Sequence, residues 1–376
     1  MPLRYFENAA VAPLPGADGA AGTLAFHRRL PGYEPTPLVD VPSVADELGL
    51  GRLLVKNESS RLGLPAFKML GASWATYRLL CDLLGGEPEW ETLEDLALAL
   101  DPIRPLTLVA ATDGNHGRAV ARTARLLGLD AEVFVPEGTT AARIEAIEGE
   151  GASVAVVHGT YDDAVAVSAT RASDRRLVVS DTSWPGYEDV PGWVIDGYET
   201  IFAEVDDQMG DDRPDAVVIQ MGVGAFAAAA ARHYRSPRRE GRRAWLLGVE
   251  PDSAACVMAS VEAGAPSEVP GPHRSIMAGL NCGKPSLIAL PVVAAAFDAF
   301  VAIDDDLARR AMRQLAAVGI VAGETGGAGL AGLEAVVSDP GPRAASGLSA
   351  ESSVLVICTE GATDPAAYAD IVGGAP

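Results

Sequence analysis

A lysine in an apolar setting is the first residue of the chain that could do chemistry. Lys68 stands within the stretch PAFKMLGA (65–72), at a predicted junction between a loop and a helix. Apolar neighbours disfavour the ammonium form, which lowers the pKa and frees the amine to form a Schiff base with a carbonyl. The alternative is a surface lysine whose stem packs on the first turn of a helix. This segment alone leaves both interpretations open.

A polar loop after a predicted strand could bind an anion. Its residues are Thr112, Asp113, Gly114, Asn115, His116 and Gly117. Backbone N–H groups at a helix start bind carboxylates, and the amide of Asn115 can contact a ring hydroxyl. The carboxylate of Asp113 would then lie unusually close to that anion. The alternative is an ordinary N-cap turn, in which Asp and Asn are common, and His116 is expected to support the turn rather than to catalyse.

A glycine turn follows a second predicted strand. It comprises Gly222, Val223, Gly224, Ala225 and Phe226, and it opens the predicted helix 225–233. Glycines allow positive φ and close backbone approach, and a helix N-terminus favours phosphate. The turn carries neither the full dinucleotide fingerprint with its acidic partner nor a Walker lysine. A monophosphate therefore fits better than a nucleotide.

These features together predict a pyridoxal 5′-phosphate site. Lys68 would form the internal aldimine, Asn115 would contact the ring, and residues 222–226 would hold the phosphate. Thr359, at the end of a predicted strand, could meet the pyridine nitrogen.

Alternating strands and helices indicate an α/β protein that presents these residues at strand ends. The first series has strands at 106–111, 132–135, 153–157 and 177–180, with helices at 118–127, 140–150 and 162–172. The second series has strands at 216–220, 245–249 and 354–357, with helices at 194–205, 225–233, 253–263, 306–318 and 328–337. Two doubly wound domains with mostly parallel sheets are expected, with the cofactor in the cleft between them. Residues 338–353 are expected to form a polar loop.

Composition narrows the class of protein. The 376 residues carry a formal net charge of −22 and are 48% hydrophobic, which excludes a disordered chain and argues against nucleic-acid binding. That acidity would suit a cationic small substrate. The four cysteines lack metal-site spacing, so no metal is expected. No signal peptide is evident, and the apolar stretch 287–297 is too short to span a membrane. We therefore expect a cytoplasmic enzyme without membrane partners.

The order of these motifs resembles that of the fold type II, or tryptophan synthase β-like, pyridoxal phosphate enzymes. The early segments PTPL (35–38) and KNES (56–59) are also similar to theirs. Within that group the chain is most similar to the diaminopropionate ammonia-lyases over residues 25–370. The segments that carry this resemblance are ATDGNHGR (111–118), DTSWPGY (181–187), WVIDGY (193–198), IMAGLNCG (276–283) and TEGATDP (359–365).

The resemblance implies roles for individual residues. Lys68 would hold the cofactor and remove the α-proton of the L-substrate, and Asp113 would remove that of the D-substrate. Asp181 would help to bind the distal ammonium of the substrate, and Thr112, Gly114 and His116 would belong to the loop that binds its carboxylate. Cys256 and Cys282 match a pair that lies close in this family and can form a disulfide. Two free thiols remain the alternative.

The resemblance also implies an activity and an organisation. The expected reaction is α,β-elimination of ammonia from 2,3-diaminopropionate or a close relative, giving pyruvate and ammonia. The alternatives are a serine or threonine dehydratase and a β-replacement synthase of the same fold. Residues 1–70 and 188–376 are expected to form a large cofactor-binding domain, and 71–187 a smaller domain with the carboxylate loop. A homodimer is expected.

Overall fold

The chain folds into two compact units. The structure, a computed structural model, describes residues 3–12, 14, 22–112, 114–237 and 243–376. The larger unit comprises Met1–Asp18, Pro35–Ser60 and Ile201–Pro376, and the smaller one comprises Gly19–Glu34 and Arg61–Thr200. The boundaries expected from the sequence therefore differ, since 19–34, 61–70 and 188–200 belong to the smaller unit. The reason is packing: residues 194–198 lie against the first turn of the helix that follows Lys68.

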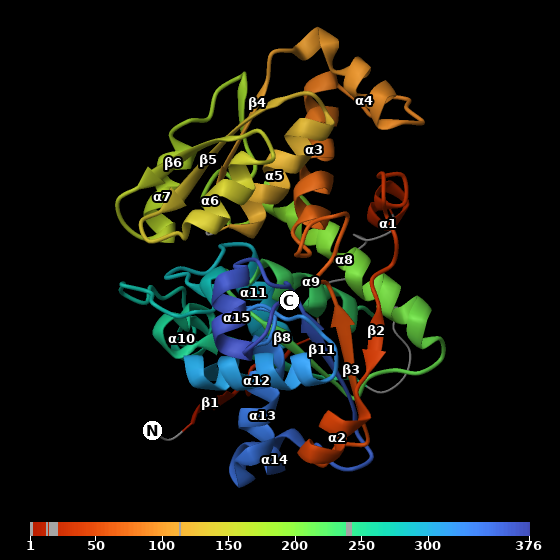
Figure 1. The fold of residues 1–376 in the computed structure, drawn as a ribbon, viewed down its shortest axis with the longest axis vertical. Helices are drawn as coiled ribbons and strands as arrows, with labels where there is room; N and C mark the ends of the chain where they lie inside the picture. The colour runs from red at the N-terminus through yellow and green to blue at the C-terminus, as the bar shows by residue number, and fades with distance from the viewer. Residues whose placement is uncertain (1–2, 13, 15–21, 113, 238–242) are drawn as a thin grey trace. The chain divides into compact units, whose positions relative to one another are not determined.

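In the described residues of the larger unit, seven strands form one sheet (Figure 1). In spatial order they are β1 (Arg4–Glu7), β10 (Ala299–Ile303), β9 (Trp245–Pro251), β8 (Ala216–Gln220), β11 (Ser353–Cys358), β3 (Arg52–Asn57) and β2 (Leu38–Asp40). Only the outermost pairings, β1 with β10 and β2 with β3, are antiparallel. The five central strands run parallel, so their carboxyl ends meet at one edge of the sheet.

The central strands are rich in β-branched residues because both faces of the sheet are covered. In β8, Ala216 and Val218 join a core that also includes residues of α2, α12 and α13, while Val217 and Ile219 are equally buried on the opposite face. Helices of this unit are α2 (Pro42–Leu48), α9 (Ala225–Tyr234), α10 (Cys256–Ala263), α11 (Ala289–Ala296), α12 (Asp305–Ala317), α13 (Ala328–Ser338), α14 (Pro340–Ser346) and α15 (Pro365–Val372), with 3₁₀ turns η3 (Asp252–Ala254) and η4 (Ala278–Leu280).

In the described residues of the smaller unit, four strands form a fully parallel sheet. In spatial order they are β6 (Ser153–Val157), β5 (Asp130–Pro136), β4 (Thr107–Ala111) and β7 (Arg176–Val178). Its helices are α1 (Thr23–His27), α3 (Met69–Leu84), α4 (Leu93–Ala99), α5 (Asn115–Leu126), α6 (Ala141–Glu148) and α7 (Tyr161–Ala169), with the 3₁₀ turn η2 (Asp101–Ile103). Helix α8 (Asp189–Met209) contributes residues 189–200 to this unit and 201–209 to the larger one.

The expected α/β class and parallel sheets are confirmed, and one expectation is wrong. Within the predicted loop 338–353, residues 340–346 form helix α14. Asp339 caps this helix by accepting a hydrogen bond from the N–H of Gly341, and Pro340 fits its first turn. In the part of the chain that the structure describes, no helix is both long and apolar enough to cross a bilayer.

Candidate functional site

Lys68 lies at the N-cap of α3, the loop-to-helix junction expected from the sequence. The sequence contains three lysines. Lys56 is fully buried, and its ammonium donates to Glu204, Gln208 and the carbonyl of Thr36. Lys284 is 56% exposed and pairs with Glu268. Lys68, at 20% exposure, is the lysine that combines partial burial with access for a ligand.

The carboxylate of Asp181 is a charged partner of Lys68. Lys68 Nζ lies 2.6 Å from Asp181 Oδ2, and the Tyr161 hydroxyl donates to Asp181 Oδ1 at 2.9 Å. Burial by itself would raise the pKa of Asp181, but the Lys68 ammonium and these hydrogen bonds hold that pKa well below its usual range. While it pairs with the Lys68 ammonium, Asp181 is therefore held as a carboxylate at neutral pH.

Strand order in the smaller unit explains how the loop at 112 and Asp181 come to the same edge. β4 and β7 are parallel neighbours, so the loop after Ala111 and the segment after Val178 leave the sheet together. His116 Nε2 donates to the carbonyl of Val179 at 2.8 Å. His116 thus ties helix α5 to the segment that carries Asp181, which agrees with a supporting role.

The anion-binding loop begins helix α5. Gly114 has φ of 154° and donates its N–H to Thr112 Oγ1 at 2.9 Å, and Asn115 is the first residue of the helix. A Cβ at Gly117 would collide with the Thr112 side chain, so this glycine allows the loop to fold back on the helix. Asp113 lies outside the described residues.

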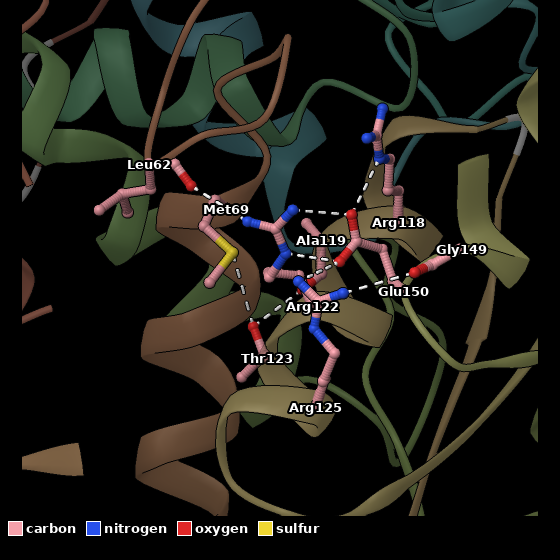
Figure 2. A network of polar contacts seen from close by, with 9 residues as sticks. All are labelled: Leu62, Met69, Arg118, Ala119, Arg122, Thr123, Arg125, Gly149 and Glu150. Atoms are coloured by element: carbon pink, nitrogen blue, oxygen red, sulfur yellow. Dashed lines mark hydrogen bonds and ion pairs between the residues drawn. The ribbon is translucent and has the colours of Figure 1, made fainter. Parts of the chain in front are cut away.

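A buried carboxylate, Glu150, holds helix α5 through three arginines (Figure 2). The Glu150 side chain is 4% exposed and forms ion pairs with Arg118, Arg122 and Arg125 at 2.5–3.3 Å. Arg122 also donates to the carbonyl of Leu62, at 3.5 Å, in the loop that precedes Lys68. The contacts in Figure 2 therefore link helix α5, which begins at Asn115, to the loop that leads to Lys68.

The glycine turn of the larger unit joins β8 to the ten-residue helix α9. Gly224 is the N-cap of α9 and has φ of +94°, a conformation that favours glycine. A Cβ at Gly222 would lie 3.0 Å from the Gly279 carbonyl oxygen and 3.1 Å from Cys282 Sγ. The turn thus packs closely against its own unit at a helix N-terminus, a setting whose free N–H groups are suited to an anion. Phe226 is buried and stacks on Phe202.

Thr359 lies just after β11, the strand next to β8, so it shares an edge of the sheet with the glycine turn. The amide of buried Gln220 donates to Thr359 Oγ1 at 2.9 Å and to the carbonyls of Thr325 and Ile357. The Thr359 hydroxyl is therefore oriented by a neutral donor.

All four cysteines are buried, and none of them forms a disulfide in the structure. Cys256 Sγ lies 3.8 Å from the Gly222 carbonyl oxygen. Cys282 also approaches Gly222, on the side where a Cβ would project. Both thiols thus pack behind the glycine turn.

The residues present fit pyridoxal phosphate. The smaller unit has a partly exposed lysine at the start of α3, which can bond to the cofactor aldehyde. The larger unit has a glycine turn at the N-terminus of α9, which suits a phosphate, and the hydroxyl of Thr359, which accepts a hydrogen bond from Gln220. Within the described ranges, no cluster of three or more His, Cys, Asp or Glu residues is arranged for a metal ion.

Sequence reasoning missed Tyr161, Tyr198 and Gln220. Tyr161 bonds Asp181, Tyr198 is fully buried beside Lys68, and Gln220 orients Thr359. Each makes a contact with a residue at least 20 positions away. Gln220 is the last residue of a predicted strand, just before the glycine turn. This position is the sequence feature that could have indicated a role at the site.

Comparisons with known proteins agree with this geometry. Residues 29–360 match the family model of pyridoxal-phosphate dependent enzymes. A diaminopropionate ammonia-lyase of Salmonella typhimurium is 36% identical over 388 residues, covering 98% of this chain and 95% of the relative. The crystal structure of the Escherichia coli diaminopropionate ammonia lyase in complex with D-serine is similar with a TM-score of 0.89 and 34% identity, covering 99% of this chain and 97% of that one.

A second crystal structure of the Escherichia coli enzyme, in complex with an aminoacrylate-PLP azomethine reaction intermediate, is similar with a TM-score of 0.87 and 32% identity, covering 98% and 96% of the two chains. With this likeness over nearly its full length, the chain belongs to the diaminopropionate ammonia-lyase family of pyridoxal-phosphate dependent enzymes.

Proposed function

We propose that the protein eliminates ammonia from 2,3-diaminopropionate. With one water consumed, each substrate gives one pyruvate and two molecules of ammonia. Pyridoxal phosphate, when bound, supplies the electron sink for negative charge at the α-carbon. Similarity over nearly the full length to enzymes of this name supports the proposal.

The observation that carries the choice of substrate is the ionised carboxylate of Asp181 at 2.6 Å from Lys68 Nζ. The carboxylate attracts a cationic side chain, which favours a diamino acid over serine or threonine at this position. Ammonia also leaves a β-ammonium group as a neutral molecule without first receiving a proton.

We propose the remaining roles from the motifs of the chain and its resemblance to the family. Lys68 would hold the cofactor and, once released, remove the α-proton of the L-substrate. The backbone N–H groups of residues 222–226 would bind the phosphate, Asn115 the ring hydroxyl and Thr359 the ring nitrogen. Thr112, Gly114 and His116 belong to the loop that would bind the substrate carboxylate at the start of α5. In this proposal the larger unit is the main cofactor-binding domain.

The reaction is tested by comparing substrates on the purified holoenzyme. We expect kcat/KM for 2,3-diaminopropionate to exceed that for serine or threonine by about a hundredfold or more. A site built to bind one polar group of its substrate discriminates at least this strongly against an analogue that lacks the group. Formation of 2-oxo acid is the measurement. Faster turnover of serine or threonine would establish a dehydratase instead. Loss of pyruvate to a new β-substituted amino acid when sulfide is added would establish a β-replacement synthase.

We propose that Asp113 is the base for the D-isomer, because the α-proton of that isomer points to the opposite face from Lys68 once amine and carboxylate are fixed. Asp113→Asn keeps the size of the side chain and removes the base. It should lower kcat for the D-isomer by about a hundredfold or more, with the L-isomer affected far less. Equal loss for both isomers would make Asp113 a binding residue only.

We also propose a cytoplasmic homodimer. The four buried thiols fit a reducing compartment, and the homodimer is the assembly that we expect from the resemblance to the fold type II enzymes. Light scattering on purified holoenzyme measures the mass; the mass of one 38.8 kDa chain would contradict the dimer.

A further inference from the structure

Two glycines allow helices α3 and α8 to touch immediately after Lys68. A Cβ at Gly197 would lie 2.5 Å from the Leu70 carbonyl oxygen and 2.8 Å from Gly71 Cα. A Cβ at Gly71 would lie 2.5 Å from Tyr198 Cε1. Real Cβ atoms do not approach other atoms this closely, so the crossing requires glycine at both positions.

This crossing brings the aromatic ring of Tyr198 beside the Lys68 amine. Tyr198 is fully buried, and its ring centroid lies 4.7 Å from that of Phe67. Lys68 Nζ lies 5.7 Å from the Tyr198 centroid and 5.3 Å from the Phe67 centroid. The amine thus has aromatic neighbours in addition to the carboxylate of Asp181.

The two aromatic neighbours of Lys68 belong to different segments of the chain. Phe67 precedes Lys68 directly and moves with it, whereas Tyr198 belongs to a different helix and is fixed by the glycine crossing. A lysine side chain has several rotatable bonds, and confining it against a fixed wall reduces the entropy lost on reaching a reactive geometry. The phenol stays neutral, because burial and the Asp181 carboxylate raise the pKa of Tyr198 more than the Lys68 ammonium and its hydrogen bond with the phenol lower it.

We propose that Tyr198 is a positioning residue for Lys68, its ring confining the amine beside Asp181 so that Nζ meets the cofactor aldehyde and the α-proton of the L-substrate in a reactive orientation. The proposal rests on the function assigned to Lys68 above. In the step concerned, the Lys68 ammonium first releases a proton to solvent. The neutral amine would then add to the aldehyde carbon, with formation of a C=N bond and loss of water. A hydrogen bond to Lys68 also acts on the phenolic hydroxyl. We assign the positioning to the ring, which packs over the amine.

The experiment reloads the full-length chain, stripped of cofactor, with pyridoxal phosphate and follows absorbance near ~410 nm. Tyr198→Leu should slow this step by about fivefold to tenfold, the size expected from losing an aromatic wall beside a cation. It should lower kcat for the L-isomer by a similar factor with KM little changed, and affect the D-isomer less. Tyr198→Phe keeps the ring and should stay within about twofold of the wild type in both assays.

Tyr77→Leu is the matched control, because it removes the same ring from the same unit. Tyr77 is buried on α3 among Phe26, Trp74 and Trp90, well along the helix from Lys68. It should lower thermal stability without slowing the cofactor step. Equal slowing by both leucine variants would reduce Tyr198 to general packing, and no slowing by Tyr198→Leu would also overturn the proposal. A Tyr198→Phe variant as slow as Tyr198→Leu would transfer the role to the hydroxyl and contradict the assignment to the ring.

Gly71→Ala provides a second test should Tyr198→Leu not fold, because it displaces the ring instead of removing it. Its control is Gly86→Ala just beyond α3, where a Cβ would meet no atom within 4 Å. Gly71→Ala should slow the cofactor step and Gly86→Ala should not; equal rates would contradict the proposal. If the wild-type chain itself forms no bond between Lys68 and the cofactor, the proposed function fails first, and that result is distinct from a failure of Tyr198 alone.

Discussion

The residues that we assign to the cofactor and substrate differ in kind between the two units. The larger unit uses main-chain atoms: Gly222 and Gly224 leave the backbone bare between β8 and α9. The smaller unit uses side chains: Lys68 and Asp181 meet at 2.6 Å, with Tyr161 and Tyr198 around them. The glycine turn therefore depends on its backbone conformation, and the cluster around Lys68 depends on the pairing of partly buried charges.

This difference predicts how each half fails. A backbone cradle tolerates change at its neighbours but not at its glycines, since a new Cβ alters the conformation itself. A side-chain cluster tolerates small shape changes, but it is sensitive to charge and therefore to pH.

The larger effect is expected from Gly224→Val. Valine at φ of +94° is strained, and the altered turn should weaken binding of pyridoxal phosphate by about a hundredfold. Equilibrium titration of the cofactor by absorbance or fluorescence measures the affinity. Gly264→Val is the matched control, because Gly264 has φ of +66° at the end of α10 with no atom near its Cβ position. Both variants should be less stable than the wild type, but only Gly224→Val should bind the cofactor more weakly. Unchanged affinity of Gly224→Val for pyridoxal phosphate would contradict the assignment of the phosphate to this turn.

A smaller, pH-dependent effect is expected from Asp181→Asn. The pKa of Asp181 is lower in the folded protein than in the unfolded chain, so its ion pair adds stability above the ordinary carboxyl pKa of about 4. That contribution is lost as the pH falls through the folded-state pKa. At pH 7 the variant should be less stable by about 1–2 kcal/mol, and the gap should narrow below about pH 4.

Urea unfolding midpoints of the two proteins across this pH range check the prediction. Asp306→Asn serves as the control, since Asp306 is 88% exposed and pairs with Arg309 at the surface. It should change stability by less than about 0.5 kcal/mol at every pH. A gap between wild type and Asp181→Asn that stays constant with pH would show that the Asp181 charge does not stabilise the fold.

The sequence predicted the backbone half of the site better than the side-chain half. The strand at 216–220, the glycine turn and the helix from 225 were expected where the structure has them, because strand and helix periodicities and glycines are local signals. Asp181 was expected to face the substrate, but its contact with Lys68 spans 113 positions and leaves no local pattern. The helix at 340–346 was missed because its Pro and Gly content is typical of a loop.

The tyrosines were missed for a related reason. Tyr198 reaches Lys68 only because Gly71 and Gly197 let two helices touch, and a sequence shows small residues without showing which of them meet. The domain boundary was misplaced by the same contact, since the packing of α8 on α3 assigns residues 188–200 to the smaller unit.

Reduction of the holoenzyme with borohydride, followed by peptide mapping, tests the central claim most directly. The reagent fixes the cofactor on the lysine that bears it, and the sequence offers three: Lys56, Lys68 and Lys284. We predict the modification on the peptide that contains Lys68 and its absence in Lys68→Ala, which should also lose at least about a thousandfold in turnover. Modification of Lys56 or Lys284 in the wild type would contradict the account, as would full activity of Lys68→Ala.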